Sequence, residues 1–312
     1  MKKLFLLVIV LMCGCSEDFS PNGEYVPKLI VYGVIDGNSS MQLIRVYSTY
    51  SPDLYDPLRP APNTTIANAT VRVNEGTSTY LFHDTDITVS GTSGNRSIHA
   101  YVNYSLLPVG SKNYSLKVSA PGYDTVKSSF KGLTDGDILT TASLFSKPGT
   151  EKVLPVRISM GLNSIAYLVT IAFEYRVGNE STLRRREVPS SVIRNADGDV
   201  TKKIYPSLVY RNTTMAAPYV YETVNFDVDA YLLTASDIKA EFGSSAVLIR
   251  TIVTMKQFDT NLYTYFSIAN AFGSTATLRL DEPDYTNISN GFGVFGMMNS
   301  LERSYGTPSG TK

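Results

Sequence analysis

The chain has 312 residues, which is enough for one large domain or two ordinary ones. Its 28 lysines and arginines balance its 28 aspartates and glutamates, and this neutral balance argues against nucleic-acid binding, which requires a basic surface. After residue 15, no apolar run approaches the length of a transmembrane helix.

The first fourteen residues have the pattern of a secretory signal peptide. Lys2 and Lys3 precede an apolar run, Leu4 to Met12, that is too short to span a bilayer as a permanent helix. Small residues then precede Cys15, as lipoprotein signal peptidase requires before a cysteine that carries a diacylglyceryl group. We therefore predict cleavage after residue 14 and lipidation of Cys15. The alternatives are lipidation of Cys13, which bulkier residues precede, and a plain secretory peptide cut near Cys15.

Lipid on Cys15 would place the protein at a membrane surface. One acyl chain binds a membrane only reversibly, whereas a diacylglyceryl group with a further acyl chain makes the attachment effectively permanent. Residues 15–27 are polar and contain turn-forming residues, so we predict that they form a tether. A segment of this length reaches roughly 40 Å when it is fully extended.

From residue 28 the pattern of side chains is that of strands. Short runs of alternating apolar and polar residues are separated by turns, and the 21 tyrosines suit a pleated, half-buried surface. Seven or so strands across about a hundred residues predict an immunoglobulin-like or transthyretin-like β-sandwich over residues 28–131. The expected strands cover residues 29–32, 41–47, 69–73, 79–82, 99–106, 113–118 and 124–130.

Residues 131–150 contain the best candidate boundary, and a second β-rich domain is expected over residues 132–312. Its expected strands cover residues 153–160, 166–177, 219–233, 246–254 and 290–298, and a hairpin turn is expected over residues 195–199. The side chains of Arg184, Arg185 and Arg186 cannot converge, because neighbours in a strand point to opposite faces. We interpret these arginines as an exposed edge strand, whose charges deter pairing with another chain.

One segment departs from the strand pattern. Helical spacing over roughly 256–272 predicts a helix that packs its aromatic face onto a sheet and ends near Gly273. The expected fold class is therefore all-β with one helix in the C-terminal region. The residues with this spacing are Met255, Phe258, Leu262, Tyr265, Phe266, Ala269 and Phe272.

Several segments together resemble the Bacteroidetes lipoproteins that are grouped as domain of unknown function 4249. The resemblance rests on the signal peptide with Cys15, on segments 27–35, 66–73 and 107–118, and on the aromatic helix. Its most specific part is Asn287 to Gly296, with the sequence NISNGFGVFG. The chain departs from the family pattern at Tyr32 and Val34, so those two positions carry no functional inference.

The resemblance implies an outer-membrane lipoprotein, often encoded beside TonB-dependent receptors, for which no catalytic activity is established. Proteins of this phylum use acidic residues after the lipidated cysteine as a signal for export to the outer leaflet. The sequence Ser16-Glu17-Asp18 is similar to that signal, which implies a protein that faces the cell exterior. The alternative is an acidic tether that is merely solvated.

No sequence motif of this chain indicates a catalytic, cofactor or metal site strongly. Gly291, Gly293 and Gly296 match the spacing of a dinucleotide fingerprint, but they alternate with apolar residues as in a strand. The histidines, His83 and His99, have no metal-ligand spacing to another histidine or cysteine. Asp-x-Asp pairs, such as the one that begins at residue 84, lack the glutamate of a calcium-binding EF-hand loop. We therefore expect no catalytic residues, no metal and no cofactor apart from the lipid.

Tyrosines on a loop supply rigid contact area with a polar hydroxyl group, as binding surfaces do. Tyr50 and Tyr55 lie on a loop over residues 48–62 and are candidate contact residues, whereas Tyr47 is expected to end a strand. We expect a non-enzymatic binding or accessory lipoprotein that partners an outer-membrane receptor, with an unknown ligand. The alternatives are an adhesin or fimbria-like subunit and a surface hydrolase that uses His83 or His99.

Overall fold

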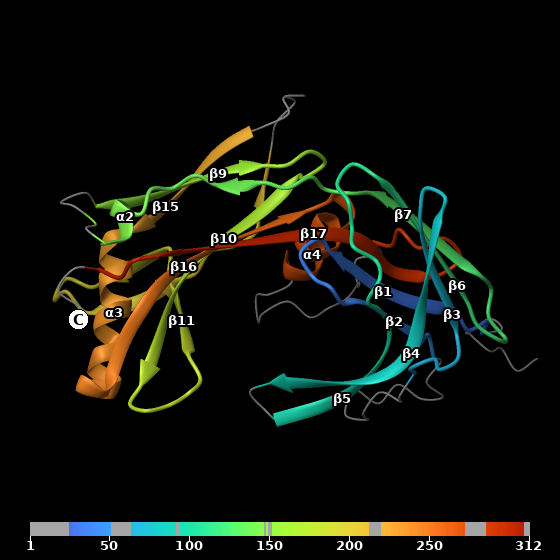
Figure 1. Cartoon of the computed structure of the whole chain (residues 1–312), viewed down its shortest axis with the longest axis horizontal. Helices are drawn as coiled ribbons and strands as arrows, with labels where there is room; N and C mark the ends of the chain where they lie inside the picture. Colours follow the sequence, from blue (N-terminus) through green and yellow to red (C-terminus); the bar gives the residue numbers. More distant parts are fainter. Residues whose placement is uncertain are drawn as a thin grey trace, which may run out of the picture.

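The computed structural model describes residues 25–50, 64–91, 94–146, 148, 152–211, 220–271 and 285–308. The predicted signal peptide, Cys15, the acidic residues after it, and Tyr55 lie outside these ranges. Within them strands dominate, which confirms the prediction of a mainly β protein with few helices (Figure 1). No helix in this part of the chain is long and apolar enough to cross a membrane.

The first lobe, residues 25–134, is a β-sandwich. Its strands alternate buried and exposed side chains, so that one face of each strand packs into a core, as the period of two in the sequence predicts. The strands are β1 (Leu29–Asp36), β2 (Gln42–Ser48), β3 (Thr70–Glu75), β4 (Ser78–Gly91), β5 (Gly94–Asn103), β6 (Asn113–Ser119) and β7 (Val126–Lys131).

Strand β4 joins the two layers of this sandwich. Its first part pairs with β3, and from His83 onward it pairs with β5, so the strand passes from one layer to the other. One layer contains β3, β6 and β7, and the other contains β1, β2 and β5. The core between them includes the fully buried side chains of Val31, Ile44, Val73 and Leu116.

The second lobe, residues 135–271, places a small sheet and a helix against the main sheet. The small sheet has the order β15-β9-β8, and helix α3 packs beside it. The elements are β8 (Asp137–Ile138), α2 (Ser143–Ser146), β9 (Val153–Met160), β10 (Ala166–Val177), β11 (Arg184–Val188), β12 (Ser191–Arg194), β13 (Val200–Ile204), β14 (Val209–Tyr210), β15 (Val220–Asp227), α3 (Val228–Phe242), η1 (Gly243–Ser245), β16 (Ala246–Phe258) and α4 (Thr260–Ala271).

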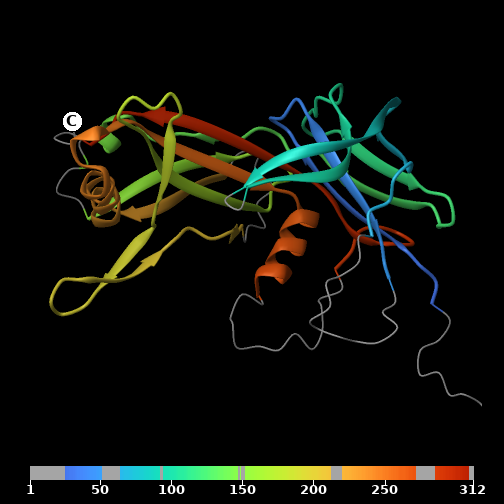
Figure 2. The same ribbon diagram turned by 90° about the horizontal axis from the view of Figure 1, so that it is seen from below.

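The last strand, β17 (Phe292–Tyr305), joins the two lobes. It pairs in parallel with β1 and antiparallel with β16, so that one sheet runs through the described chain in the order β11-β10-β16-β17-β1-β2-β5-β4-β3-β6-β7. Figures 1 and 2 show β17 crossing from one lobe to the other, with α4 beside it. The domain boundary expected near residue 131 stays a prediction, since Phe295 and Met297 of β17 belong to the same hydrophobic core as the strands of the first lobe.

The two longer helices differ from the sequence-based expectation. Helix α4 begins at Thr260 rather than at 256, because β16 continues through Phe258 between β10 and β17. The strand expected over 219–233 ends at Asp227, and α3 follows it. Helix α3 was not predicted, although its buried residues recur at the spacing of an amphipathic helix. These residues include Val228, Tyr231, Ala235 and Ile238.

Other local predictions agree with the structure. Strand β11 is at one end of the strand order, which confirms that the three arginines lie on an edge strand. The β12–β13 hairpin turns at the predicted position, where the Asn195 N–H donates to the Asp199 carbonyl over 2.9 Å. Gly198 has a φ of 89°, a conformation that glycine adopts without a steric penalty.

Candidate functional site

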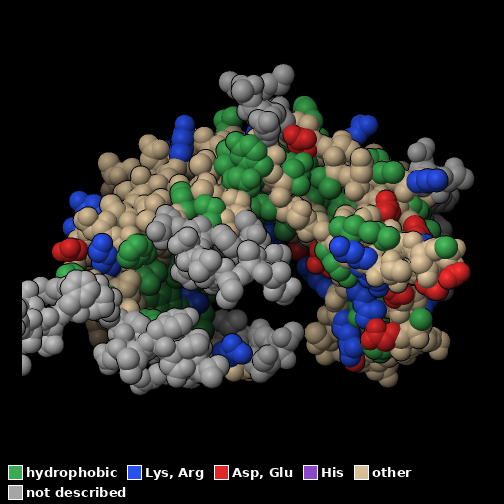
Figure 3. Space-filling model, turned by 180° about the vertical axis from the view of Figure 1, so that it is seen from behind, with side chains coloured by type: hydrophobic (Ala, Val, Ile, Leu, Met, Phe, Trp, Pro, Cys, Tyr) green, Lys and Arg blue, Asp and Glu red, His purple; other side chains and the backbone are tan. Residues whose placement is uncertain are grey.

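The main sheet has an inner face that carries a third, smaller core cluster, in which Ala166, Phe258, Leu262 and Val294 are buried. Side chains alternate across a strand, so Tyr32 points away from the core that contains Val31. The same face carries Arg45, which lies opposite Tyr32 in the β1–β2 register, and Val294, which lies opposite Tyr32 in the β1–β17 register. Helix α4 packs on this face, and Figure 3 shows that the molecule is hollowed between its two lobes.

Half-buried aromatic rings gather on the inner face around α4. The Tyr32 ring makes edge contacts with Tyr47 and with Tyr265, each with ring centroids 6.1 Å apart, and Tyr265 contacts Phe266 at 5.7 Å. The Arg45 guanidinium lies 4.9 Å from the centroid of the Tyr47 ring. Tyrosine and arginine are the residues that protein interfaces favour, because their flat side chains bury a large area and keep polar atoms for hydrogen bonds.

Arg45 has an unused donor at this face. Its Nε is buried and has no hydrogen-bond partner among the described residues, and its side chain is half-buried. A buried donor without a partner destabilises a protein, because it has lost its hydrogen bonds to water. The aromatic cluster of Tyr32, Arg45, Tyr47, Tyr265 and Phe266 is here called the aromatic face.

Helix α4 is fixed to the sheet by a buried carboxylate. Asp259 accepts the N–H of Leu262 at 2.8 Å, which caps the helix, and the N–H of Met297 at 3.1 Å, which ties the helix to β17. Only 4% of Asp259 is exposed, and this burial raises the pKa of its carboxyl to about 6 despite the backbone hydrogen bonds. Gly296 leaves room for this contact, since a Cβ there would lie 2.7 Å from an Asp259 oxygen.

The segment with the sequence NISNGFGVFG packs beneath the same helix. The Asn287 side chain pairs with Phe295 like a neighbouring strand, donating to its carbonyl at 2.7 Å and accepting its N–H at 2.9 Å. Asn261 of α4 donates to that carbonyl at 3.3 Å and accepts the Tyr285 hydroxyl at 3.0 Å. The motif therefore positions α4 and the aromatic face, and the structure gives its glycines a packing role.

A charged cluster flanks the inner face on the second lobe. Glu174 is almost fully buried, and its two oxygens accept hydrogen bonds from Arg185 and Arg250. Burial alone would raise the pKa of Glu174, but the hydrogen bonds from these arginines outweigh burial and hold its pKa below the usual value. Arg185 also pairs with Glu302 at 2.8 Å. These charges neutralise one another, so the cluster stabilises the sheet and leaves no charge for a ligand.

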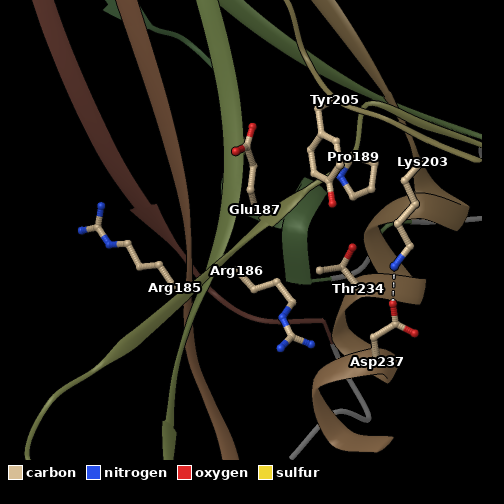
Figure 4. A pocket seen from close by; sticks show the side chains of 8 residues that line it. All are labelled: Arg185, Arg186, Glu187, Pro189, Lys203, Tyr205, Thr234 and Asp237. Atoms are coloured by element: carbon tan, nitrogen blue, oxygen red, sulfur yellow. Dashed lines mark hydrogen bonds and ion pairs between the residues drawn. The ribbon is translucent and has the colours of Figure 1, made fainter. Parts of the chain in front are cut away.

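A pocket of about 570 Å³ lies between β11, the β12–β13 hairpin and α3 (Figure 4). Lys203 pairs with Asp237 across it at 2.7 Å, and Arg186 pairs with Glu241. Figure 4 shows Arg185 pointing to the opposite side of β11 from Arg186, as strand geometry requires. The cations that line this pocket already have anionic partners. The lining residues are Arg185, Arg186, Glu187, Pro189, Lys203, Tyr205, Thr234 and Asp237.

The two histidines lie on the β4–β5 hairpin. His99 lies between two carboxylates. Its Nδ1 lies 3.0 Å from an Asp86 oxygen in hydrogen-bond geometry. Its Nε2 lies 2.8 Å from an Asp84 oxygen, but the angles of this contact are not those of a hydrogen bond. Both ring nitrogens therefore face aspartates, and a nucleophilic hydroxyl would need one of them. His83 is exposed. The described residues contain no group of three His, Cys, Asp or Glu that could hold a metal ion.

The tyrosines of the predicted binding loop have different positions. Tyr47 lies on the inner face within the aromatic cluster, and Tyr50 is 47% exposed just beyond the end of β2. Tyr55, Cys15 and the acidic segment Ser16 to Asp18 lie outside the described residues and stay predictions. Tyr265 was expected on the aromatic face of the helix, but the sequence did not group it with Tyr32 and Arg45, because only the strand register and the position of α4 bring the three together.

The fold and the inner face define a mainly β protein in which a single sheet connects two lobes and holds a helix on its free face. The model of the family described as Domain of unknown function (DUF4249) matches residues 16–304, and the chain belongs to that family. This match confirms the family that the sequence motifs resemble. No curated protein matches the chain.

Proposed function

We propose that the protein is a non-enzymatic, lipid-anchored binding or accessory lipoprotein of the outer membrane. In this proposal Cys15 carries the lipid, Ser16 to Asp18 direct export to the outer leaflet, and the folded body faces the cell exterior. The partner is a TonB-dependent receptor of the same membrane. Lipid on Cys15 keeps the protein and such a receptor in one plane, which raises their effective concentration.

One observation carries the binding role. The aromatic face combines half-buried rings with an arginine whose Nε has no partner among the described residues, and it lies on the sheet face that carries α4. Such a face supports binding of a protein segment that carries a carbonyl or carboxylate and an apolar side chain. The contacts of His99 with Asp84 and Asp86 support a structural role rather than hydrolysis.

Affinity capture from mildly solubilised membranes tests this function. We expect the wild-type protein to capture a TonB-dependent receptor barrel, and a Tyr47→Ser/Tyr265→Ser variant to lose at least 90% of it, since hot-spot aromatics dominate interface energy. Tyr221→Ser is the matched control, because Tyr221 is 69% exposed on β15 of the other lobe. Recovery of the wild-type protein alone, or equal capture by all three proteins, would contradict the proposal.

A further inference from the structure

The outer layer of the sandwich in the first lobe has a basic surface that the neutral composition of the chain does not predict. Strands β3, β6 and β7 lie together at one end of the molecule (Figure 1). We call the sheet face that carries their exposed side chains the outer face. Arg72 lies directly opposite Lys117, and Lys117 lies directly opposite Lys127. Neighbouring strands are about 4.8 Å apart, so the three cations form a row about 10 Å long.

This row is unfavourable for the fold alone. Like charges that are directly opposite on neighbouring strands repel one another and destabilise a sheet. None of Arg72, Lys117 and Lys127 has an ion pair in the described part of the chain, whereas Arg184, Arg185, Arg186, Arg194 and Arg250 of the second lobe all do. Three adjacent cations without carboxylates are therefore available to an external anion.

A groove of about 510 Å³ lies beside the row. The hydroxyls of Ser128 and Ser289 already donate to backbone carbonyls, so the hydroxyls of Ser115 and Ser129 are the donors that it adds. Lys117 and Lys127 line it, and the remaining lining residues are mostly hydroxyl and amide side chains. Asn74, Ser115 and Ser129 form the next cross-strand row, so donors flank the cations on one side. Ammonium, guanidinium, hydroxyl and amide groups are the donors that bind phosphate oxygens. The lining residues are Asn74, Ser115, Leu116, Lys117, Lys127, Ser128, Ser129, Asn287 and Ser289.

The position of the tether indicates where the phosphates come from. The described chain begins beside Thr49, whose hydroxyl accepts the Lys28 N–H at 2.9 Å, and leads into β1. A Cβ on Gly291 would meet the Leu29 carbonyl at 2.6 Å and Val126 at 2.8 Å, so the start of β1 and the start of β7 flank this glycine. The tether therefore joins the folded body at the edge of the outer face, within reach of the membrane that holds the predicted lipid.

We infer that the outer face binds the phosphate-bearing headgroups of the membrane surface to which the protein is anchored. The proposal that the anion belongs to a membrane rests on the proposed lipidation of Cys15. The basic row follows from the strand register alone. The three cations lie on an exposed sheet face, where a broad anionic surface can reach all of them at once. Each basic residue near an anionic membrane strengthens binding about fivefold, so three residues together contribute roughly 100-fold at low salt.

Vesicle co-sedimentation of the full chain with Cys15→Ser tests the inference without the lipid. We expect binding to vesicles of 30% phosphatidylglycerol in phosphatidylcholine, weak binding to pure phosphatidylcholine, and loss of affinity as NaCl rises. Arg72→Ser/Lys117→Ser/Lys127→Ser should weaken binding roughly 100-fold. The control, Lys152→Ser/Arg176→Ser/Lys202→Ser, removes the same charge from exposed positions of the second lobe and should keep most of the affinity.

Stability provides an independent readout. Because the row is self-repulsive, Arg72→Ser/Lys117→Ser/Lys127→Ser should leave the melting temperature unchanged or raise it, and that result would exclude misfolding as the cause of weaker binding. Equal losses in both triple variants, or no binding to anionic vesicles, would overturn the inference. Displacement by inorganic phosphate beyond the effect of NaCl at equal ionic strength would indicate a discrete phosphate site instead of a membrane surface. Binding to heparin without binding to vesicles would replace the membrane with an anionic polysaccharide. All these outcomes are independent of whether Cys15 is lipidated in cells.

Discussion

Asp259 and Glu174 are both buried carboxylates of the second lobe, but their surroundings move their pKa values in opposite directions. Burial dominates at Asp259, whose partners are backbone N–H groups, and raises its pKa to about 6. Arg250 and Arg185 overcome burial at Glu174 and lower its pKa. The charge of Asp259 is thus unfavourable in the folded protein, whereas the charge of Glu174 is favourable.

Asp259→Asn should remove a pH dependence of stability. Between about pH 4 and 6 the unfolded state has lost the Asp259 proton and the folded state still binds it, so the free energy of unfolding falls as the pH rises. A shift of about two units corresponds to about 3 kcal/mol over this window. Urea denaturation of both proteins from pH 4 to pH 7.5 measures the difference. If the free energy of unfolding changed with pH equally in wild type and variant, the carboxyl of Asp259 would not have the raised pKa that burial gives it.

Glu174→Gln should destabilise the protein at pH 7 by about 2 kcal/mol, because two arginines lose their charged partner. The wild-type contribution is present above the unfolded pKa and is lost as the pH falls through the lowered pKa. The control Glu180→Gln removes the exposed partner of Arg184 and should change the free energy of unfolding by less than about 0.5 kcal/mol. Guanidinium denaturation at pH 7 measures both changes, and equal effects would argue against a buried cluster.

At the scale of elements, β17 depends on glycines that let it approach its neighbours. Gly293 has a φ of 105°, and a Cβ there would collide with the Val31 carbonyl of β1. We expect Gly293→Ala to destabilise the protein by more than about 3 kcal/mol, since backbone strain and a steric clash add together. Gly178→Ala is the control, because Gly178 also has a positive φ but has open space around its Cα, and it should cost about 1 kcal/mol. Thermal unfolding compares the two variants. Equal losses of stability would contradict the close approach of Gly293 to the Val31 carbonyl.

The elements were predictable wherever local pattern decides them. The alternation in β1 and the arginines of β11 identified strands correctly, because the period of two follows from the backbone itself. The start of α4 was not predictable, because Met255 and Phe258 fit a helical spacing but are held in β16 by pairing on both sides. Helix α3 was missed, although Val228, Tyr231, Ala235 and Ile238 carried the helical signal.

At the scale of the whole molecule, the sites depend on pairings that no local pattern encodes. The contact of β1 with β17 joins residues from opposite ends of the described chain, and it completes the first core with Phe295. The row of Arg72, Lys117 and Lys127 exists only because the strand register aligns these residues. A shift of one residue in either pairing would move one cation to the opposite face of its strand.

The shared strand predicts that the first lobe does not fold alone. A fragment of residues 25–134 lacks Phe295, whose ring centroid lies 4.8 Å from that of Phe130, and leaves the β1 edge without β17. We expect no cooperative thermal transition from this fragment by calorimetry, because a cavity in the core and an open strand edge both lower stability. Joining residues 285–308 to the fragment through a flexible linker should restore the transition. A sharp transition in the short fragment would instead show an independent domain.

We propose that the protein works as a lipid-anchored binding protein at a membrane surface. Mass spectrometry of the mature protein extracted from membranes tests this claim most directly. The account predicts an N-terminus that begins at Cys15 and carries a diacylglyceryl group with a further acyl chain. A mature N-terminus at another residue, with an unmodified Cys15 or none, would contradict it.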